Sequence, residues 1–296
     1  MSYTGSFIVV DYYTPPANTQ VEQFYDIFVD DSGRIYGTYC SNGTGDKRGF
    51  RLTPTATTPS ITWSSTEIIA PGTYKCPAGI AVLPNGDIYL GFQENAPNPS
   101  FFKIPAGTSL PTATTGSGFL PIVSGITCPL DIAFDPTYST MYIPDGCTSK
   151  IWTVDMATLA ATSTSQLAPY IYGMVTDAQG AIYIASPWWS GGNTNNGVYK
   201  IADPKVSMAP VRLAHINTPQ SDVRIQGVCI DRVSNVLYAI DIKYNNIYKV
   251  NPTTGDYVLI ATWTGRNSNH CFVDKDGYVY VSSGGDGFVG RLEPAS

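Results

Sequence analysis

The chain has 296 residues, of which 43% are hydrophobic and 12% aromatic, so it can bury a complete core. Only 14% of the residues are charged and the net charge is −6, whereas a nucleic-acid surface needs clustered Lys and Arg. No apolar run approaches the roughly 18 residues that span a bilayer. We therefore expect neither a nucleic-acid partner nor a membrane span.

The first predicted element is a β-strand over residues 6–11, and a recurring sequence unit follows it. The unit is a β-branched run, an acidic or glycine-containing turn, and a second run that contains Tyr. Its first copy runs from Asp26 to Tyr36 and its second from Gly79 to Tyr89. The six tyrosines are 41 to 55 residues apart, which is the length of a propeller blade. They are Tyr36, Tyr89, Tyr142, Tyr183, Tyr238 and Tyr280.

Each copy predicts a hairpin with a tight turn, followed by a third strand and an outer fourth strand. The fourth strand of copy three is the least distinct and is expected near residues 165–170. Copy six ends after its third strand at Leu292, so the strand at 6–11 is its expected fourth strand. The sequence thus predicts an all-β fold, a six-bladed β-propeller forming a single domain over 1–296. The strand 6–11 completes the blade formed by 270–292, and such closure removes exposed sheet edges.

Copy five, residues 227–250, resembles an NHL repeat, and copies two and six resemble it in their first halves. The resemblance extends to the superfamily of gluconolactonase-like, paraoxonase-like and strictosidine-synthase-like propellers. It implies a ring whose ligands bind at the mouth of the central channel. The metal-dependent hydrolases of that group place a Glu, two Asn and an Asp around calcium. This chain departs from that set, because Asp26 stands where the Glu is expected.

Aligning the six copies on their turns places three ionisable residues, Asp26, Asp131 and His270, and three glycines at one equivalent channel position. Such a trio could hold a divalent cation, Ca²⁺ first and Zn²⁺ or Mn²⁺ second. The ion would assist hydrolysis of an ester or lactone, which is the first functional hypothesis. Without a metal, the trio could act as acid and base in a lyase, isomerase or cyclase. The structural alternative is that the aspartates cap backbone amides and His270 fills the channel.

Aromatic and polar residues flank the channel positions or follow the second strands. Together they predict an aromatic rim around the channel mouth, which would suit a small organic ligand. The same rim would also suit a non-catalytic propeller that binds a ligand, glycan or peptide. The predicted substrate-binding residues are Tyr25, Phe92, Tyr172, Trp188, Trp189, Gln226, Lys243 and Tyr244.

The start of the sequence has no signal peptide, so the protein is either intracellular or secreted with its signal removed. Six cysteines and a sequon at residues 42–44 favour the secreted alternative. Their positions in the blades predict two disulfides, Cys40–Cys76 and Cys128–Cys147. Cys229 and Cys271 lie in adjacent inner strands and can be bonded or free. A closed ring leaves no long apolar edge strand, so we expect a monomer.

Overall fold

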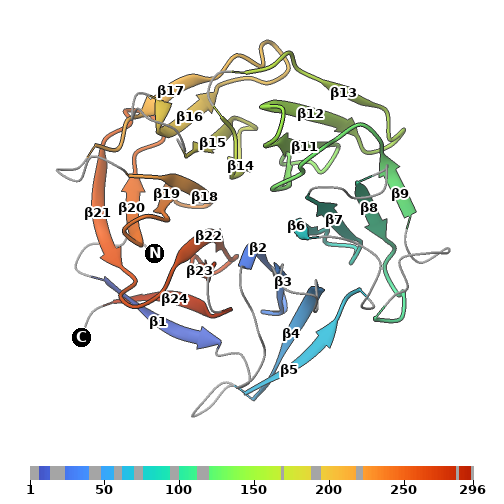
Figure 1. Cartoon of the computed structure of the whole chain (residues 1–296), viewed down its shortest axis with the longest axis horizontal. Coiled ribbons are helices and arrows are strands. Elements are labelled where there is room, and N and C mark those ends of the chain that lie inside the picture. Colours follow the sequence, from blue (N-terminus) through green and yellow to red (C-terminus); the bar gives the residue numbers. More distant parts are fainter. Residues whose placement is uncertain are drawn as a thin grey trace.

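The structure is a computed structural model in which six four-stranded antiparallel sheets are arranged in a ring (Figure 1). It describes residues 7–13, 24–39, 48–56, 62–69, 76–93, 100–111, 120–167, 170–187, 195–217, 223–284 and 287–294. Every named element of these segments is a strand, which confirms the predicted all-β propeller. No helix in the described part of the chain is long and apolar enough to cross a membrane.

Each sheet is one blade, and its strands run in chain order from the channel outward, except that the outer strand of blade 6 comes from the N-terminal segment. Blade 1 contains β2 (Phe24–Val29), β3 (Ile35–Tyr39), β4 (Arg48–Ala56) and β5 (Thr62–Glu67). Blade 2 contains β6 (Pro77–Val82), β7 (Ile88–Phe92), β8 (Phe101–Ile104) and β9 (Leu120–Val123). Blade 3 contains β10 (Ala133–Phe134), β11 (Thr140–Asp145), β12 (Lys150–Asp155) and β13 (Ala161–Ser163). Blade 4 contains β14 (Met174–Thr176), β15 (Ile182–Ser186), β16 (Gly197–Ile201) and β17 (Val211–Ala214). Blade 5 contains β18 (Ile225–Asp231), β19 (Val236–Asp241), β20 (Asn246–Val250) and β21 (Tyr257–Thr262). Blade 6 contains β22 (Ser268–Val273), β23 (Val279–Ser283), β24 (Val289–Pro294) and β1 (Phe7–Tyr13).

The ring closes in blade 6, where the N-terminal strand β1 pairs antiparallel with the C-terminal strand β24 (Figure 1). The register runs from Phe7 opposite Pro294 to Tyr13 opposite Val289, with one irregularity. The outer strand of blade 3 differs from the expectation, because it lies at Ala161–Ser163 and not at residues 165–170. It pairs with β12 directly after a turn at Asp155, so the connection is shorter than the sequence pattern suggested.

The recurring tyrosine has the same surroundings in several blades. The hydroxyl of Tyr36 donates to Asp30 at 3.2 Å, and those of Tyr183 and Tyr280 donate to Asp177 and Asp274 at 3.1 Å. A basic residue of the third strand stands opposite the tyrosine in five blades. These residues are Arg51, Lys103, Lys200, Lys249 and Arg291. The repeat therefore encodes a polar link inside at least three of the hairpins.

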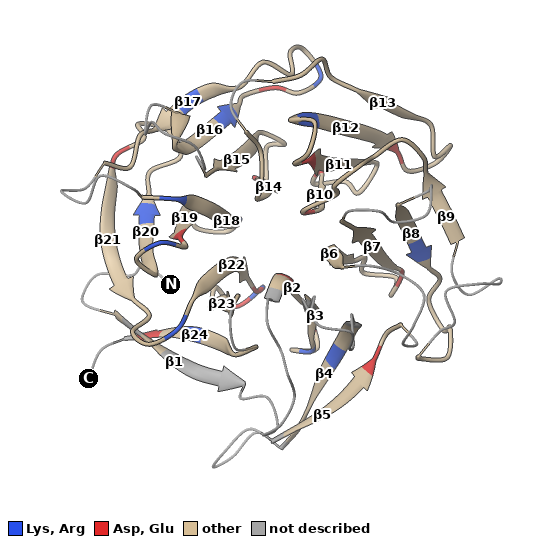
Figure 2. Ribbon diagram, viewed as in Figure 1, with Lys and Arg blue, Asp and Glu red and all other residues tan. Residues whose placement is uncertain are grey.

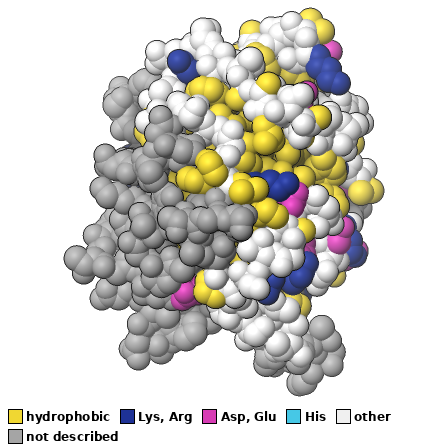
Figure 3. All heavy atoms as spheres, turned by 90° about the vertical axis from the view of Figure 1, so that its right-hand side faces the viewer, with side chains coloured by type: hydrophobic (Ala, Val, Ile, Leu, Met, Phe, Trp, Pro, Cys, Tyr) yellow, Lys and Arg dark blue, Asp and Glu magenta, His cyan; other side chains and the backbone are white. Residues whose placement is uncertain are grey.

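The hydrophobic core lies between neighbouring blades. One cluster joins Tyr183 of blade 4 to Ile230 and Leu237 of blade 5, and similar clusters follow around the ring. On the outer face that Figure 3 shows, acidic and basic side chains lie in a few small groups among polar and hydrophobic ones.

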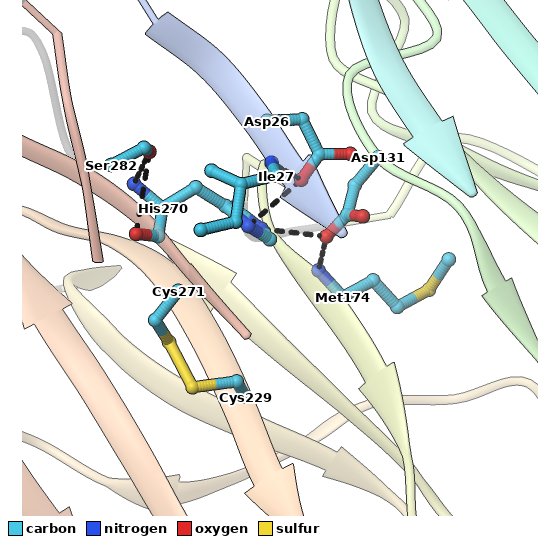
Figure 4. The surroundings of a disulfide bond; sticks show 8 residues. All are labelled: Asp26, Ile27, Asp131, Met174, Cys229, His270, Cys271 and Ser282. Carbon is cyan, nitrogen blue, oxygen red and sulfur yellow. Dashed lines mark hydrogen bonds and ion pairs between the residues drawn. A yellow bond between two sulfur atoms is a disulfide. The ribbon is translucent and has the colours of Figure 1, made fainter. Parts of the chain in front are cut away.

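Two disulfides are described, Cys128–Cys147 and Cys229–Cys271. The first is the pair that the sequence predicts, and the second resolves the alternative that was left open. Cys76 is also disulfide-bonded, while Cys40 lies outside the described residues. The Cys229–Cys271 bond joins the inner strands of blades 5 and 6 and lies beside His270 (Figure 4).

Candidate functional site

The starts of the inner strands bring Asp26, Asp131 and His270 together at the channel axis, and we name these residues the channel trio. Asp26 lies in β2, Asp131 lies two residues before β10, and His270 lies in β22. The strand register shifts at Phe24/Asp26 and at Ser268/Cys271. Such bulges re-aim a side chain, and here they coincide with the residues that point toward the axis.

His270 lies between the two carboxylates (Figure 4). Its Nε2 is 2.9 Å from Oδ2 of Asp131, with hydrogen-bond geometry. Its Nδ1 is also 2.9 Å from Oδ1 of Asp26, but this contact lacks a well-directed hydrogen bond. All three residues are at most 5% exposed, so the two contacts are screened little by water. The trio therefore forms one electrostatic unit.

Each aspartate also ties its own blade to the next. Oδ1 of Asp26 accepts from the N–H of Ile27 at 2.7 Å, and Oδ2 accepts from Ile80 in blade 2 at 2.8 Å. Asp131 repeats the pattern with Ile132 and with Met174 of blade 4, both at 2.6 Å. The capping that the structural alternative proposed is therefore present, and it coexists with the pairing to His270.

The three remaining channel positions are glycines because neighbouring backbones approach closely there. A Cβ on Gly173 would lie 2.6 Å from the carbonyl oxygen of Gln226, and one on Gly227 would lie 2.8 Å from that of Asn269. A Cβ on Gly79 would lie 3.1 Å from the backbone of Asp131. The ring therefore has room for larger side chains at only some of its six equivalent positions.

Burial and mutual charge shift the acid–base properties of the trio. Burial raises the pKa of Asp26 from its ordinary 3.8 to about 6; the positive charge of His270 opposes this rise and the charge of Asp131 adds to it. Burial by itself would lower the pKa of His270, but Asp131 and Asp26 outweigh it and hold that pKa well above 6.5. Near neutral pH the imidazole of His270 therefore holds the proton, and the Asp26 carboxylate faces its Nδ1 across 2.9 Å.

The trio has the residue types of a divalent cation site, and its ligand atoms all lie within 4.8 Å of one another. Coordination requires a nitrogen lone pair, whereas Nε2 of His270 is engaged with Asp131 and Nδ1 faces Asp26. All four carboxylate oxygens already accept a backbone N–H. This arrangement fits a proton shared within the trio better than a bound metal ion. The metal that the sequence suggested stays an untested prediction.

On the side of the trio where the inner strands begin, which we name the start face, three tyrosines gather. Tyr172 is buried with Ala78, Cys128 and Leu130, and Tyr25 and Tyr170 pack against this cluster. Burial, followed by the proximity of Tyr25, Tyr170 and Asp26, raises the pKa of Tyr172 well above 10. Tyr172 therefore stays a neutral phenol.

Gln226 lies beside the same end of the channel and is 4% exposed. Its Nε2 contacts Oδ1 of Asn269, and its buried Oε1 has no hydrogen-bond partner in the described part of the protein. Tyr25, Tyr172 and Gln226 thus lie next to the channel positions, as the sequence predicted, while their binding role stays untested.

The other predicted rim residues are placed differently. Phe92 is 1% exposed and packs edge-on against Phe102 at 5.6 Å, because its strand turns the ring into the core of blade 2. Tyr244 packs against the core between blades 4 and 5, and Lys243 is exposed. Trp188 and Trp189 lie outside the described residues.

A cavity of about 370 Å³ runs along the inner strands from the trio to the hairpin turns that join first and second strands. We name this end of the channel the turn face. Phe28, Phe134 and Phe272 line the cavity, and the rings of Phe28 and Phe272 are 4.6 Å apart. The sequence directed attention to the start face, so it did not anticipate a cavity on this side. The missed signal was the phenylalanine two positions after Asp26 and after His270, namely Phe28 and Phe272.

No protein-family model matches the chain, and no curated protein sequence matches it. Solved structures match it at low identity. Virginiamycin B lyase from Staphylococcus aureus, solved as a catalytically inactive histidine-to-alanine variant with quinupristin, is 13% identical, with a TM-score of 0.60. The match covers 97% of this chain and 98% of that chain.

Two further neighbours have different roles. An auxiliary nutrient binding protein from Bacteroides ovatus is 11% identical, with a TM-score of 0.70, over 99% of this chain and 78% of that chain. A nidogen/laminin complex matches at 15% identity and a TM-score of 0.60, over 80% and 82% of the two chains. The fold is that of the NHL-like six-bladed propellers. Its neighbours include both an enzyme and binding proteins, so fold alone leaves the function open.

Proposed function

We propose that this protein is an enzyme of the lyase kind, which moves a proton on a small organic substrate without a metal, with the channel trio as its acid–base centre. The observation that carries the proposal is the placement of His270 between two buried carboxylates at the inner end of a cavity. Pairs of titratable groups with perturbed pKa values are typical of acid–base sites.

The proposal gives each residue of the trio a role, which its contacts support. Asp131 holds the imidazole through Nε2, with a backbone N–H of blade 4 fixing the carboxylate in turn. Nδ1 is the nitrogen that exchanges a proton with Asp26, since it faces Oδ1 at 2.9 Å without a settled hydrogen bond. Asp26 lines the cavity and has a pKa of about 6, close to the value that suits proton transfer at neutral pH. Asp26 passes the proton to or from the substrate.

The proposal places the protein outside the cell. Described disulfides at Cys128–Cys147 and Cys229–Cys271 form and persist in oxidising compartments. Neighbours of the fold include the extracellular domain of a putative one-component system at a TM-score of 0.56.

The test incubates the protein with small lactones, esters and quinupristin, and follows products by mass spectrometry. Elimination opens a ring with no change in mass, whereas hydrolysis adds one water. We expect ring opening without added water, unaffected by EDTA. His270→Gln should lower kcat by about 10²–10⁴-fold, because Gln cannot carry the proton. The matched control is His215→Gln, which alters the only other histidine.

Water-containing products that disappear with EDTA and return with Ca²⁺ would contradict the proposal and support the metal-assisted hydrolysis that the sequence suggested first. Activity that survives His270→Gln in folded protein would remove the trio from the chemistry.

Ligand binding without catalysis is the second candidate. It is supported by the complete hydrogen bonding of both carboxylates, which a structural plug of the channel also requires, and by the nutrient-binding neighbour. If this candidate holds, Asp26→Asn should leave ligand affinity unchanged within about twofold, and no substrate in the set should turn over.

A further inference from the structure

Among the described residues, the turn face of the channel carries one cation, Arg232, without a carboxylate partner. Arg232 lies in the turn after β18, and its side chain lines the channel cavity. Nε donates to the carbonyl oxygen of Thr176 at 3.0 Å. Nη2 donates to Oγ1 of Thr176 at 2.7 Å and to the carbonyl oxygen of Phe134 at 3.2 Å. One side chain of blade 5 thus bonds to blades 4 and 3.

These contacts fix the guanidinium and leave one edge available. Nη1 has no protein partner among the described residues, although Nε and Nη2 are both engaged. The partners of Arg232 are neutral oxygens, so its charge is not compensated by a direct contact. A guanidinium held in this way loses little further entropy when it binds an anion.

The other cations of the cavity lining have carboxylate partners. Arg34 lies 2.6 Å from Asp30, and Lys275 lies 2.8 Å from Asp276. The acidic groups nearby are largely engaged in their own turns: Asp30, Asp231 and Asp274 each accept backbone N–H groups. Asp31 is exposed at the rim. Arg232 is therefore the described cation at this face with capacity for an external anion.

The cavity beside Arg232 has an aromatic wall, and its lining also contains aspartates of the channel trio and of the hairpin turns, namely Asp26, Asp30, Asp31, Asp131, Asp231 and Asp274. Phe28 and Phe272 form a pair 4.6 Å apart, and Phe134 and Tyr138 form a second pair 5.9 Å apart. All four rings line the same cavity as Arg232, and its volume of about 370 Å³ lies within the range of small-molecule pockets. An aromatic wall with one guanidinium matches a ligand that has an apolar body and a single carboxylate.

We infer that the turn face binds a small aryl carboxylate, with the carboxylate on Nη1 of Arg232 and the ring against Phe28 and Phe272. Arg232 makes no hydrogen bond to the channel trio, although both line the same cavity, so the inference adds a ligand subsite to that cavity and does not rest on the proposed chemistry. The two fail independently, since binding at Arg232 is measured without turnover.

The test measures binding of phenylacetate and 3-phenylpropionate by calorimetry, with phenylacetamide as the neutral analogue. We expect both carboxylates to bind at least about tenfold more tightly than the amide, the gain from one charge-assisted contact. Arg232→Met should reduce carboxylate affinity to that of the amide. The matched control is Lys275→Met, which removes one positive charge from the same face and should change affinity by less than about twofold.

Equal binding of carboxylate and amide, equal losses in the two variants, or no binding at about 10 mM probe would overturn the inference. Since Arg232 also links three blades, a second measurement uses the unaltered protein. The ¹⁵N–¹H resonance of the Arg232 side chain should shift with phenylacetate and stay unchanged with phenylacetamide. If the Arg232 side-chain resonance does not shift when phenylacetate is added, the inference is also wrong.

Discussion

The same residue type behaves differently in two regions of this propeller. Aspartates in the hairpin turns bond within their own blade: Asp177, for example, accepts from the N–H groups of Gln179 and Ala181 and from the Tyr183 hydroxyl. The channel aspartates bond across blades and pair with His270. The turn aspartates recur around the ring, whereas Asp26 and Asp131 interrupt a position that is glycine in three other blades.

The difference appears in their acid–base properties. Burial acts to raise the pKa of Asp87 and Asp231, but hydrogen bonds outweigh it and lower both values. At Asp26 burial prevails and raises the pKa to about 6. The comparison teaches that polar residues that follow the repeat stabilise blades, while those that break it are candidates for function. Figure 2 shows how few acidic and basic residues approach the centre of the ring.

The largest effect is expected when one aspartate is removed from each region. Asp131→Ala leaves the buried imidazolium with one carboxylate and the Met174 N–H without its acceptor, so it should cost about 3–5 kcal/mol of unfolding free energy. Asp177→Ala, equally buried, removes a carboxylate whose donors are all neutral and leaves no buried cation without its partner, so it should cost about 1–3 kcal/mol. Urea unfolding measures both. Equal costs would remove the distinction between the two regions.

A smaller effect is expected from the glycines at the channel position. In Gly173→Ala the new Cβ meets the carbonyl oxygen of Gln226 at 2.6 Å, so blades 4 and 5 must separate, at about 1–3 kcal/mol. The matched control is Gly284→Ala, whose Cβ meets its nearest atom at an ordinary 3.5 Å. If thermal unfolding shows no difference between these variants, crowding does not explain the channel glycines.

The smallest effect is the pH dependence, in which the two regions act in opposite directions. Asp87 and Asp231 have lowered pKa values in the folded protein. The stability that they give the fold is therefore present above pH 3.8 and is lost as the pH falls through their folded-state pKa values. His270 has a raised folded pKa, so its stability is present below 6.5 and is lost as pH rises through the folded value. Asp26 has a pKa raised from 3.8 to about 6, so it lowers the stability of the fold as the pH rises through that range.

Unfolding free energies measured from pH 4 to 9 should therefore decline on the alkaline side, by at most about 1.4 kcal/mol per pH unit for each proton. His270→Gln should remove the part of the decline above pH 6.5 that His270 contributes, and it should leave the contribution of Asp87 and Asp231 on the acid side unchanged. A decline that persists in this variant would assign the effect to other groups.

The sequence determined the architecture. Repeats from Asp26–Tyr36 onward, a strand missing after Leu292 and a spare strand before Asp26 allow little other than a ring closed by its two ends, because each blade can bury its faces only against its neighbours. The sequence also aligned Asp26, Asp131 and His270 at one position, since equivalent positions of a repeat meet at the axis.

Only the tertiary structure brought Asp131 into contact with His270, three blades away, because the narrowness of the channel depends on how closely the blades pack. It also buried Phe92, since the alternation of a strand directs a side chain inward or outward only once its neighbours are known. The placement of Arg232 across three blades was likewise invisible in the sequence, where it is one charged residue in a turn. Long-range contacts of this kind come from packing, and a local pattern does not contain them.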